Sequence, residues 1–284
     1  MQNKEPTIMN RNHTLTKMIS SPVAVALACI GTVLGPVQNA PADDASTNAP
    51  VAAVTNAPPP KHWEGVFSAD ATLARGNSRS FMGTVTVNAK GKYEPNEFLL
   101  SGAAGYGDTT TKDPVTGQDV TTKSQDYLKG SAQWNYLITD RFYAGLKLDA
   151  LHDDLADINY RFTVSPLAGY YLIKKPQTEL AVEAGPSYVY EQVGGKTDSY
   201  LGARVAERFE YRFKTGARLW ESLEWITQVD KVDNWIANAE LGISAPISKT
   251  LDVRMVLQDS YDNEPAPGRL KNDFKLLAGI GYKF

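Results

Sequence analysis

Apolar residues recur at every second position over most of this chain. In the last segment, one face carries the side chains Phe274, Leu276, Ala278, Ile280, Tyr282 and Phe284. The positions between them include the charged residues Asp273, Lys275 and Lys283. A period of two over eight or more residues is typical of a β-strand with one apolar and one polar face. The pattern therefore predicts strands rather than helices for residues 63–284.

About twelve segments show this alternation, and a transmembrane strand needs only ~9–11 residues. The segments begin near Trp63, Ser80, Phe98, Ser124, Arg141, Tyr160, Glu179, Tyr200, Arg218, Asn234, Leu251 and Leu270. The mean hydropathy of −0.33 argues against a bundle of membrane helices. It does not argue against a membrane β-barrel, because apolar and polar residues alternate along each strand of such a barrel and keep its mean hydropathy low. We expect an all-β fold: a closed, antiparallel, up-and-down transmembrane β-barrel of about twelve strands.

Aromatic residues are predicted to gather at the two rims of the barrel if successive strands run in opposite directions. One rim receives Trp63, Trp134, Tyr136, Phe142, Tyr170, Phe213, Tyr282 and Phe284. The other receives Phe81, Tyr106, Tyr160, Tyr188, Tyr190, Trp225 and Trp235. Two aromatic belts are typical of a protein that meets both interfaces of a bilayer, and a water-soluble sandwich would not show them. Tyr282 and Phe284 also predict a C-terminal signal for insertion by the barrel-assembly machinery.

The first 42 residues have the pattern of an export signal. An apolar segment at 18–34 follows three basic residues, Lys4, Arg11 and Lys17. The small residues Ala40 and Ala42 flank Pro41, which predicts cleavage after Ala42. Two alternatives stay open, a retained membrane anchor and a lipoprotein signal that ends at Cys29.

Residues 43–62 are rich in Ala, Pro, Thr and Asn, and Thr-Asn-Ala-Pro occurs twice. Such a composition cannot bury a core, so we expect an extended, disordered linker before the barrel. The expected organisation is a signal peptide at 1–42, this linker at 43–62 and an outer-membrane barrel at 63–284.

Charge and residue counts argue against several functions. The net charge of −3 gives no basic surface for nucleic acid. One cysteine and three histidines leave little room for a disulfide framework or a zinc site. We therefore expect no catalytic residue, no cofactor and no metal, and partners limited to outer-membrane lipid and the assembly machinery of a monomeric barrel.

Two clusters of polar loop residues leave an enzyme or a metal site open as alternatives. His152 lies beside Asp153 and Asp154, with Asp157 nearby, as a barrel hydrolase would require at its outer rim. Asp259, Asp262, Asn263 and Glu264 offer oxygen ligands for Ca²⁺, although without the spacing of an EF-hand. The simpler interpretation of both clusters is a solvated acidic loop.

Opposite charges face one another on the predicted inner wall. Pairing of the strands near 179–190 and 200–213 places Glu183 close to Arg208 and Glu179 close to Arg212, to within about two residues of register. Across the next turn, Arg208 also approaches Glu224. We expect Arg208 to bridge two carboxylates and to narrow the lumen, the alternative being hydrated wall charges of little net effect.

Two carboxylates do not fit the pattern, because Glu207 and Glu221 fall on the apolar outer face. A bare charge there costs up to a few kcal/mol. Either a β-bulge reverses the alternation locally, or these residues meet a partner.

The connections between strands also alternate in length. Long polar segments are expected at 108–123, 151–159, 191–199 and 258–269, with short turns at the opposite rim. This is the arrangement of outer-membrane barrels.

Three motifs resemble one family. Gly76-Asn77-Ser78 follows the first strand, and the segments at 183–190 (EAGPSYVY) and 261–268 (YDNEPAPG) come later. On these motifs the chain from Trp63 to Phe284 resembles the family of salt-induced outer-membrane proteins. The resemblance implies a Gram-negative outer-membrane barrel and brings no catalytic residues. Two functions stay open, a narrow channel connected with osmotic or salt stress and a structural barrel whose acidic loops bind surface sugars or cations.

Mass spectrometry of the exported protein is expected to find Asp43 at the mature N-terminus, because the small-x-small site precedes it. An acylated Cys29 would show that the lipoprotein alternative is the correct one.

Overall fold

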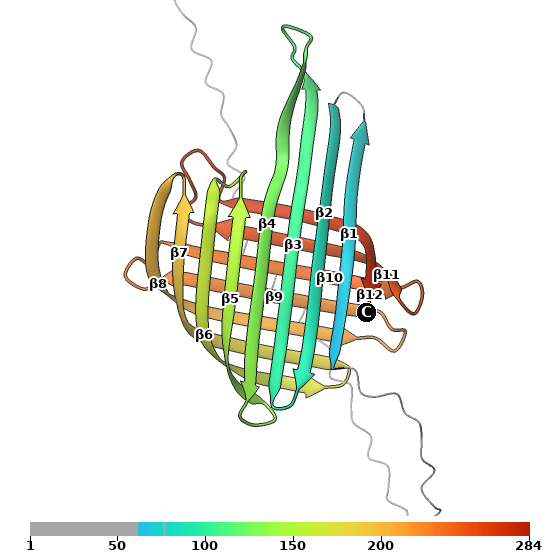
Figure 1. Cartoon of the computed structure of the whole chain (residues 1–284), viewed down its shortest axis with the longest axis vertical. Coiled ribbons are helices and arrows are strands. Elements are labelled where there is room, and N and C mark those ends of the chain that lie inside the picture. The colour runs from blue at the N-terminus through green and yellow to red at the C-terminus, as the bar shows by residue number, and fades with distance from the viewer. Residues whose placement is uncertain (1–61, 76–77) are drawn as a thin grey trace, which may run out of the picture. The chain divides into compact units, whose positions relative to one another are not determined.

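The computed structural model describes residues 62–75 and 78–284, which form a closed antiparallel barrel of twelve strands (Figure 1). Each strand pairs with the next along the chain, and the first pairs with the last. The strands are β1 (Trp63–Arg75), β2 (Ser78–Tyr93), β3 (Asn96–Lys112), β4 (Asp119–Leu137), β5 (Phe142–Asp153), β6 (Ile158–Lys175), β7 (Thr178–Val193), β8 (Lys196–Arg212), β9 (Arg218–Gln228), β10 (Trp235–Pro246), β11 (Leu251–Asp262) and β12 (Asn272–Lys283). The expected fold class is confirmed.

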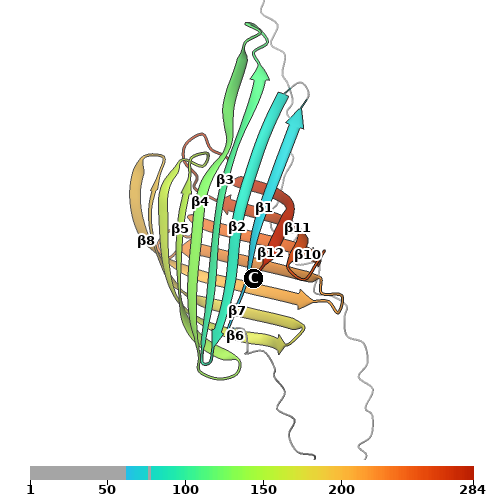
Figure 2. The ribbon, with the colours of Figure 1, turned by 45° about the vertical axis from the view of Figure 1, so that its right-hand side comes forward.

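The strands cross one another at a large angle when the barrel is seen from the side. In Figures 1 and 2 the wall of β1–β5 runs close to vertical, while β9–β12 run across the view behind it. Strong tilt is required to close a sheet into a barrel. It also brings residues of opposite walls close together inside.

Most strands begin within two residues of the expected positions, but β4 and β8 begin earlier. The segment 191–199 is therefore not a long loop. Gly194 and Gly195 have φ angles of 57° and 75° and join β7 to β8 directly. Positive φ at both central positions is the requirement of the type I′ two-residue hairpin turn, which glycine meets without strain. The segment 108–123 is mostly strand as well, and its hairpin rises beyond the neighbouring strands (Figure 1).

The two faces of the wall differ in chemistry as the alternation requires. Buried polar side chains on the inner face include Ser68, Thr84, Thr86, Gln125, Gln133, Asn135, Thr163, Ser165 and Ser187. Exposed apolar side chains on the outer face include Phe67, Val85, Leu100, Val164, Val205, Ile243, Met255 and Ile280. All eight aromatic residues of the first expected belt are exposed, and most lie at or next to strand ends.

No helix within residues 62–75 and 78–284 is long and apolar enough to cross a membrane.

The junction between β1 and β12 is short. Its register runs only from Val66↔Lys283 to Asp70↔Gly279. Below it, Phe284 N donates to Gly65 O at 3.0 Å and Gly65 N donates to Phe284 O at 3.2 Å. The Phe284 ring lies over Gly65, where any Cβ atom would overlap it. Phe284 therefore extends a junction that has few other bonds.

Deletion of Phe284 should weaken this junction, since two backbone hydrogen bonds and an aromatic contact are lost. We expect a loss of about 2 kcal/mol in the free energy of unfolding of the refolded barrel, measured by urea titration, together with lower yield in the outer membrane. Leu270→Ala is a matched control, because Leu270 is 88% exposed. Equal stability and yield of the deletion and the control would contradict the role of Phe284.

Candidate functional site

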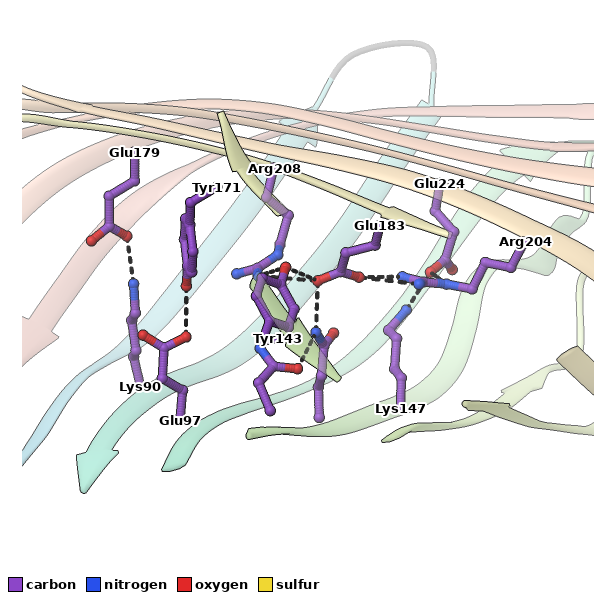
Figure 3. Close-up of polar contacts among 12 residues, drawn as sticks. Lys90, Glu97, Tyr143, Lys147, Tyr171, Glu179, Glu183, Arg204, Arg208 and Glu224 are labelled. Carbon is purple, nitrogen blue, oxygen red and sulfur yellow. Dashed lines mark hydrogen bonds and ion pairs between the residues drawn. The ribbon is translucent and has the colours of Figure 1, made fainter. Parts of the chain in front are cut away.

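The inner wall of β7 carries a carboxylate that is almost fully buried. Glu183 is 4% exposed. Both guanidinium Nη atoms of Arg204 donate to its Oε2 at 3.1 Å, and Arg208 Nη2 donates to its Oε1 at 3.1 Å. Gln133 Nε2 (2.7 Å) and the Tyr143 hydroxyl (2.8 Å) donate to the same Oε1. Figure 3 shows these donors converging on Glu183 from several strands.

Arg204 joins this carboxylate to a second one. Its Nε donates to Glu224 Oε2 on β9 at 2.6 Å. Lys147 on β5 also donates to Glu224 Oε2 at 2.6 Å and lies 3.1 Å from Asp149. The result is a continuous chain of alternating charges along the inner wall, from Glu183 through Arg204 and Glu224 to Lys147 (Figure 3) and on to Asp149.

Further contacts cross the lumen between strands that are not neighbours. Lys90 on β2 donates to Glu179 on β7 at 2.6 Å. The Tyr171 hydroxyl on β6 donates to Glu97 on β3 at 2.6 Å. Lys147 and Glu224 likewise connect β5 and β9. Each contact holds two walls of the barrel at a fixed distance.

An apolar cluster supports these polar contacts from below. Tyr143, Leu167, Tyr171 and Ala181 pack together inside the barrel, and each is at most 7% exposed. The Tyr143 ring lies over Gly169 on β6, where a Cβ atom would overlap it. Because both tyrosines are fixed by packing, their hydroxyl groups reach Glu183 and Glu97 in one defined position.

The cavity inside the barrel has a volume of about 1010 Å³. Its lining carries the charges described above and further ones, including Lys129, Arg161, Glu240, Arg254, Asp262 and Lys275. This is a polar, charged and subdivided space rather than an open tube.

Of the three expected contacts, only that of Arg208 with Glu183 is an ion pair in the structure. Arg208 lies 3.1 Å from Glu183, as the register suggested, but it does not reach Glu224. Both Glu183 and Glu224 lie opposite Ala206, so Arg204 and Arg208 are each two residues from them in register. The pairing rule cannot choose between two such diagonal neighbours, and in the structure Arg204 is the bridging residue.

The pair of Glu179 with Arg212 is the second correction. Glu179 lies opposite Glu210 and binds Lys90 and Lys92 across the lumen. Arg212 instead lies 2.6 Å from Glu210 and 3.4 Å from Glu64. Pairing along a hairpin considers only neighbouring strands, whereas the closed barrel also offers partners from the opposite wall.

Several functional residues were missed by the sequence reasoning. They are Lys90, Glu97, Gln133, Tyr143, Lys147, Tyr171 and Arg204. Their inward parity and charge or hydroxyl groups were visible signals, but their partners lie on strands distant in order.

The acidic loop residues are held by the chain itself. Asp262 lies 2.7 Å from Arg161, and Glu264 pairs with Lys231. Asp154 lies 2.8 Å from Lys123 and 3.2 Å from His152 Nε2. Such bonds compete with a cation or a substrate for these carboxylates.

Asp153 Oδ1 accepts hydrogen bonds from the backbone N–H groups of Leu155 and Ala156, both at 3.0 Å.

Across residues 62–75 and 78–284 no group of three or more His, Cys, Asp and Glu side chains is placed to hold a metal ion.

Glu207 and Glu221 lie on the outer face, as expected from parity. The registers of β7 with β8 and of β8 with β9 are continuous, so a bulge does not turn them inward. Glu207 borders a groove of about 510 Å³ that is otherwise mostly apolar, with Tyr170, Val205 and Trp225 in its lining. Among the described residues, no Lys, Arg or His side chain lies within 4.0 Å of either carboxylate.

The residues named for export, Cys29 and Ala42, lie outside the described residues, as do Gly76 and Asn77 of the first family motif.

Removal of the buried carboxylate of Glu183 should lower the free energy of unfolding far more than removal of the carboxylate of Glu210 near the rim. Glu183→Ala leaves Arg208 without a carboxylate partner and Arg204 with Glu224 alone. We expect a loss of about 3–5 kcal/mol in unfolding free energy. Glu210→Ala, which breaks a partly exposed pair, should cost at most about 1 kcal/mol. Urea unfolding of the refolded barrel measures both.

The same measurement distinguishes the two arginines. Because Arg204 touches two carboxylates and Arg208 one, Arg204→Gln should destabilise the barrel more than Arg208→Gln. The opposite order would mean that Arg208 is the bridging residue after all.

Similar folds occur among solved structures. The NanC porin is 6% identical with a TM-score of 0.47, over 78% of this chain and 100% of that chain. An outer membrane channel from Pseudomonas putida F1 is 14% identical with a TM-score of 0.43, over 83% and 100%. The KdgM porin is 8% identical with a TM-score of 0.42, over 78% and 99%.

Among curated proteins none matches the sequence. The model of one family, described as protein of unknown function, DUF481, matches residues 68–284. The chain therefore belongs to the DUF481 family.

Proposed function

We propose that this protein is a narrow, non-enzymatic channel for ions and small polar solutes in the outer membrane of a Gram-negative bacterium. The observation that carries the proposal is the charged cavity of about 1010 Å³ inside a closed barrel. A closed barrel satisfies its backbone groups within the wall, and its apolar outer face suits a bilayer. A polar lining lowers the cost of moving hydrated solutes through the interior.

The contacts across the lumen set the width of the path. Barrels of about eight strands are filled by side chains, and those of sixteen or more leave an open channel. This barrel lies between these limits, and Lys90–Glu179, Lys147–Glu224 and Tyr171–Glu97 divide its interior. We therefore infer low conductance, since a solute passes beside these contacts or displaces them.

The apolar outer wall and exposed aromatic residues support outer-membrane lipid as the surroundings of the barrel. We further propose insertion of a monomer by the barrel-assembly machinery after removal of the export signal. A path restricted to ions and small osmolytes suits a role in salt or osmotic stress.

The alternatives have weaker support. A barrel hydrolase would use His152 and its neighbouring acids, but Asp154 is paired with Lys123 and Asp153 holds two backbone amides. A binding role of the outer loops would use Asp262 and Glu264, which are both paired with basic residues of this chain.

Planar-bilayer recordings of the mature barrel should show small, reproducible conductance steps. Lys90→Ala removes the shorter of the two contacts that Glu179 on β7 makes with β2, and leaves only Lys92 at 3.4 Å. It should raise the step size at least about twofold, because it widens the lumen. Lys231→Ala is the control, since it removes a lysine of equal charge from an outer loop and should leave the step unchanged. Absence of conductance from both wild type and Lys90→Ala would refute the channel.

A further inference from the structure

One lysine inside the barrel has no carboxylate partner in the described residues. Lys129, on the inner face of β4, has its Nζ 3.4 Å from Gln258 Oε1 on β11 and no carboxylate oxygen within 4.0 Å. By contrast, Lys90 and Lys147 each lie 2.6 Å from a glutamate. The lumen thus contains a positive charge that the protein does not neutralise by direct contact.

The nearest acids are occupied elsewhere. Glu240 accepts from Trp220 Nε1 and from Gln258 Nε2, both at 2.7 Å, so Gln258 lies between it and Lys129. Asp153 accepts two backbone amides in the β5–β6 turn. These bonds leave Lys129 available to a ligand in the cavity that it lines.

A second lysine approaches from the opposite wall. Lys275 on β12 has its Nζ 4.1 Å from the centre of the Tyr127 ring, and Lys129 Nζ lies 5.8 Å from the same ring. Lys275 is 2.9 Å from Asp273, whose side chain is 58% exposed. Three strands separate β4 from β12 around the wall, so the two ammonium groups reach the same ring only because the barrel is closed.

The tyrosine between them contributes an unused donor. Tyr127 is 5% exposed, and its hydroxyl has no hydrogen-bond partner among the described residues. A buried hydroxyl without a partner is unfavourable by about 1–3 kcal/mol. A ligand oxygen at this position would remove that cost, and Tyr127 lines the same cavity as both lysines.

We propose that Lys129, Lys275 and Tyr127 form a binding site in the lumen for the carboxylate groups of a small organic anion. Two ammonium groups attract negative charge into the low-dielectric interior, and bonds from charged donors are the strong ones. The hydroxyl adds a directed donor, which favours a carboxylate oxygen over a simple halide ion. The site deepens the proposed function, on which it rests, by giving the channel a class of solute.

Citrate serves as the probe, and isothermal titration calorimetry on the refolded barrel in detergent measures its binding without any need for conduction. Lys129→Gln keeps a donor for Gln258 but removes the charge, and we expect about tenfold weaker citrate binding. Tyr127→Phe should also weaken binding. Lys231→Gln, which makes the same change in an outer loop, should bind as the wild type does.

Equal citrate affinity of the wild type and Lys129→Gln would overturn the site, and so would an equal loss in Lys231→Gln. The migration of unboiled protein on gels verifies that each variant forms a barrel. Block of potassium chloride current by citrate separates the two proposals. If citrate binding depends on Lys129 but the barrel does not conduct, the site is supported and the channel is refuted. If the barrel conducts but does not bind citrate, the channel is supported and the site is refuted.

Discussion

A carboxylate taken out of water inside a barrel needs donors on all sides, and Glu183 receives them from four side chains on three other strands. Burial of a lone charge is strongly unfavourable, whereas a fully bonded one is tolerated. Arg204, Arg208, Gln133 and Tyr143 therefore have to lie where they do for the fold to be stable. The packing of Tyr143 and the alternation of charge toward Lys147 both follow from this requirement.

The same interactions that stabilise the interior also narrow it. Contacts between opposite walls, such as Lys90–Glu179, subdivide the space that the strand number makes available. At Lys129, which has no carboxylate within 4.0 Å among the described residues, the interior has a charged donor without an acidic partner. In the proposed channel, the paired charges would hold the walls together, and Lys129 would be available to a solute.

The period of two was sufficient to predict the strands, their approximate starts and the face on which each residue lies, because alternation follows directly from strand geometry. Pairing within a hairpin brought Arg208 to Glu183. It failed for Glu224, since Arg204 and Arg208 are symmetric about the opposite residue Ala206. It could not find Lys90 for Glu179, because contacts across the lumen depend on closure and tilt. The polar residues of 191–199 predict a long loop, but Gly194 and Gly195 permit a tight turn there, and the polar residues beside them belong to the strands.

The short junction of β1 with β12 has a consequence for how the barrel assembles. All other strand pairs join neighbours in sequence, so they form from local contacts, whereas Val66 and Lys283 come from opposite ends of the barrel sequence. Contacts of long sequence separation are slow to form because much chain entropy is lost before they are made. Closure is therefore expected to be the last and slowest event of folding. Until then, the sheet has two free edges, at β1 and β12, and free edges can pair with another chain.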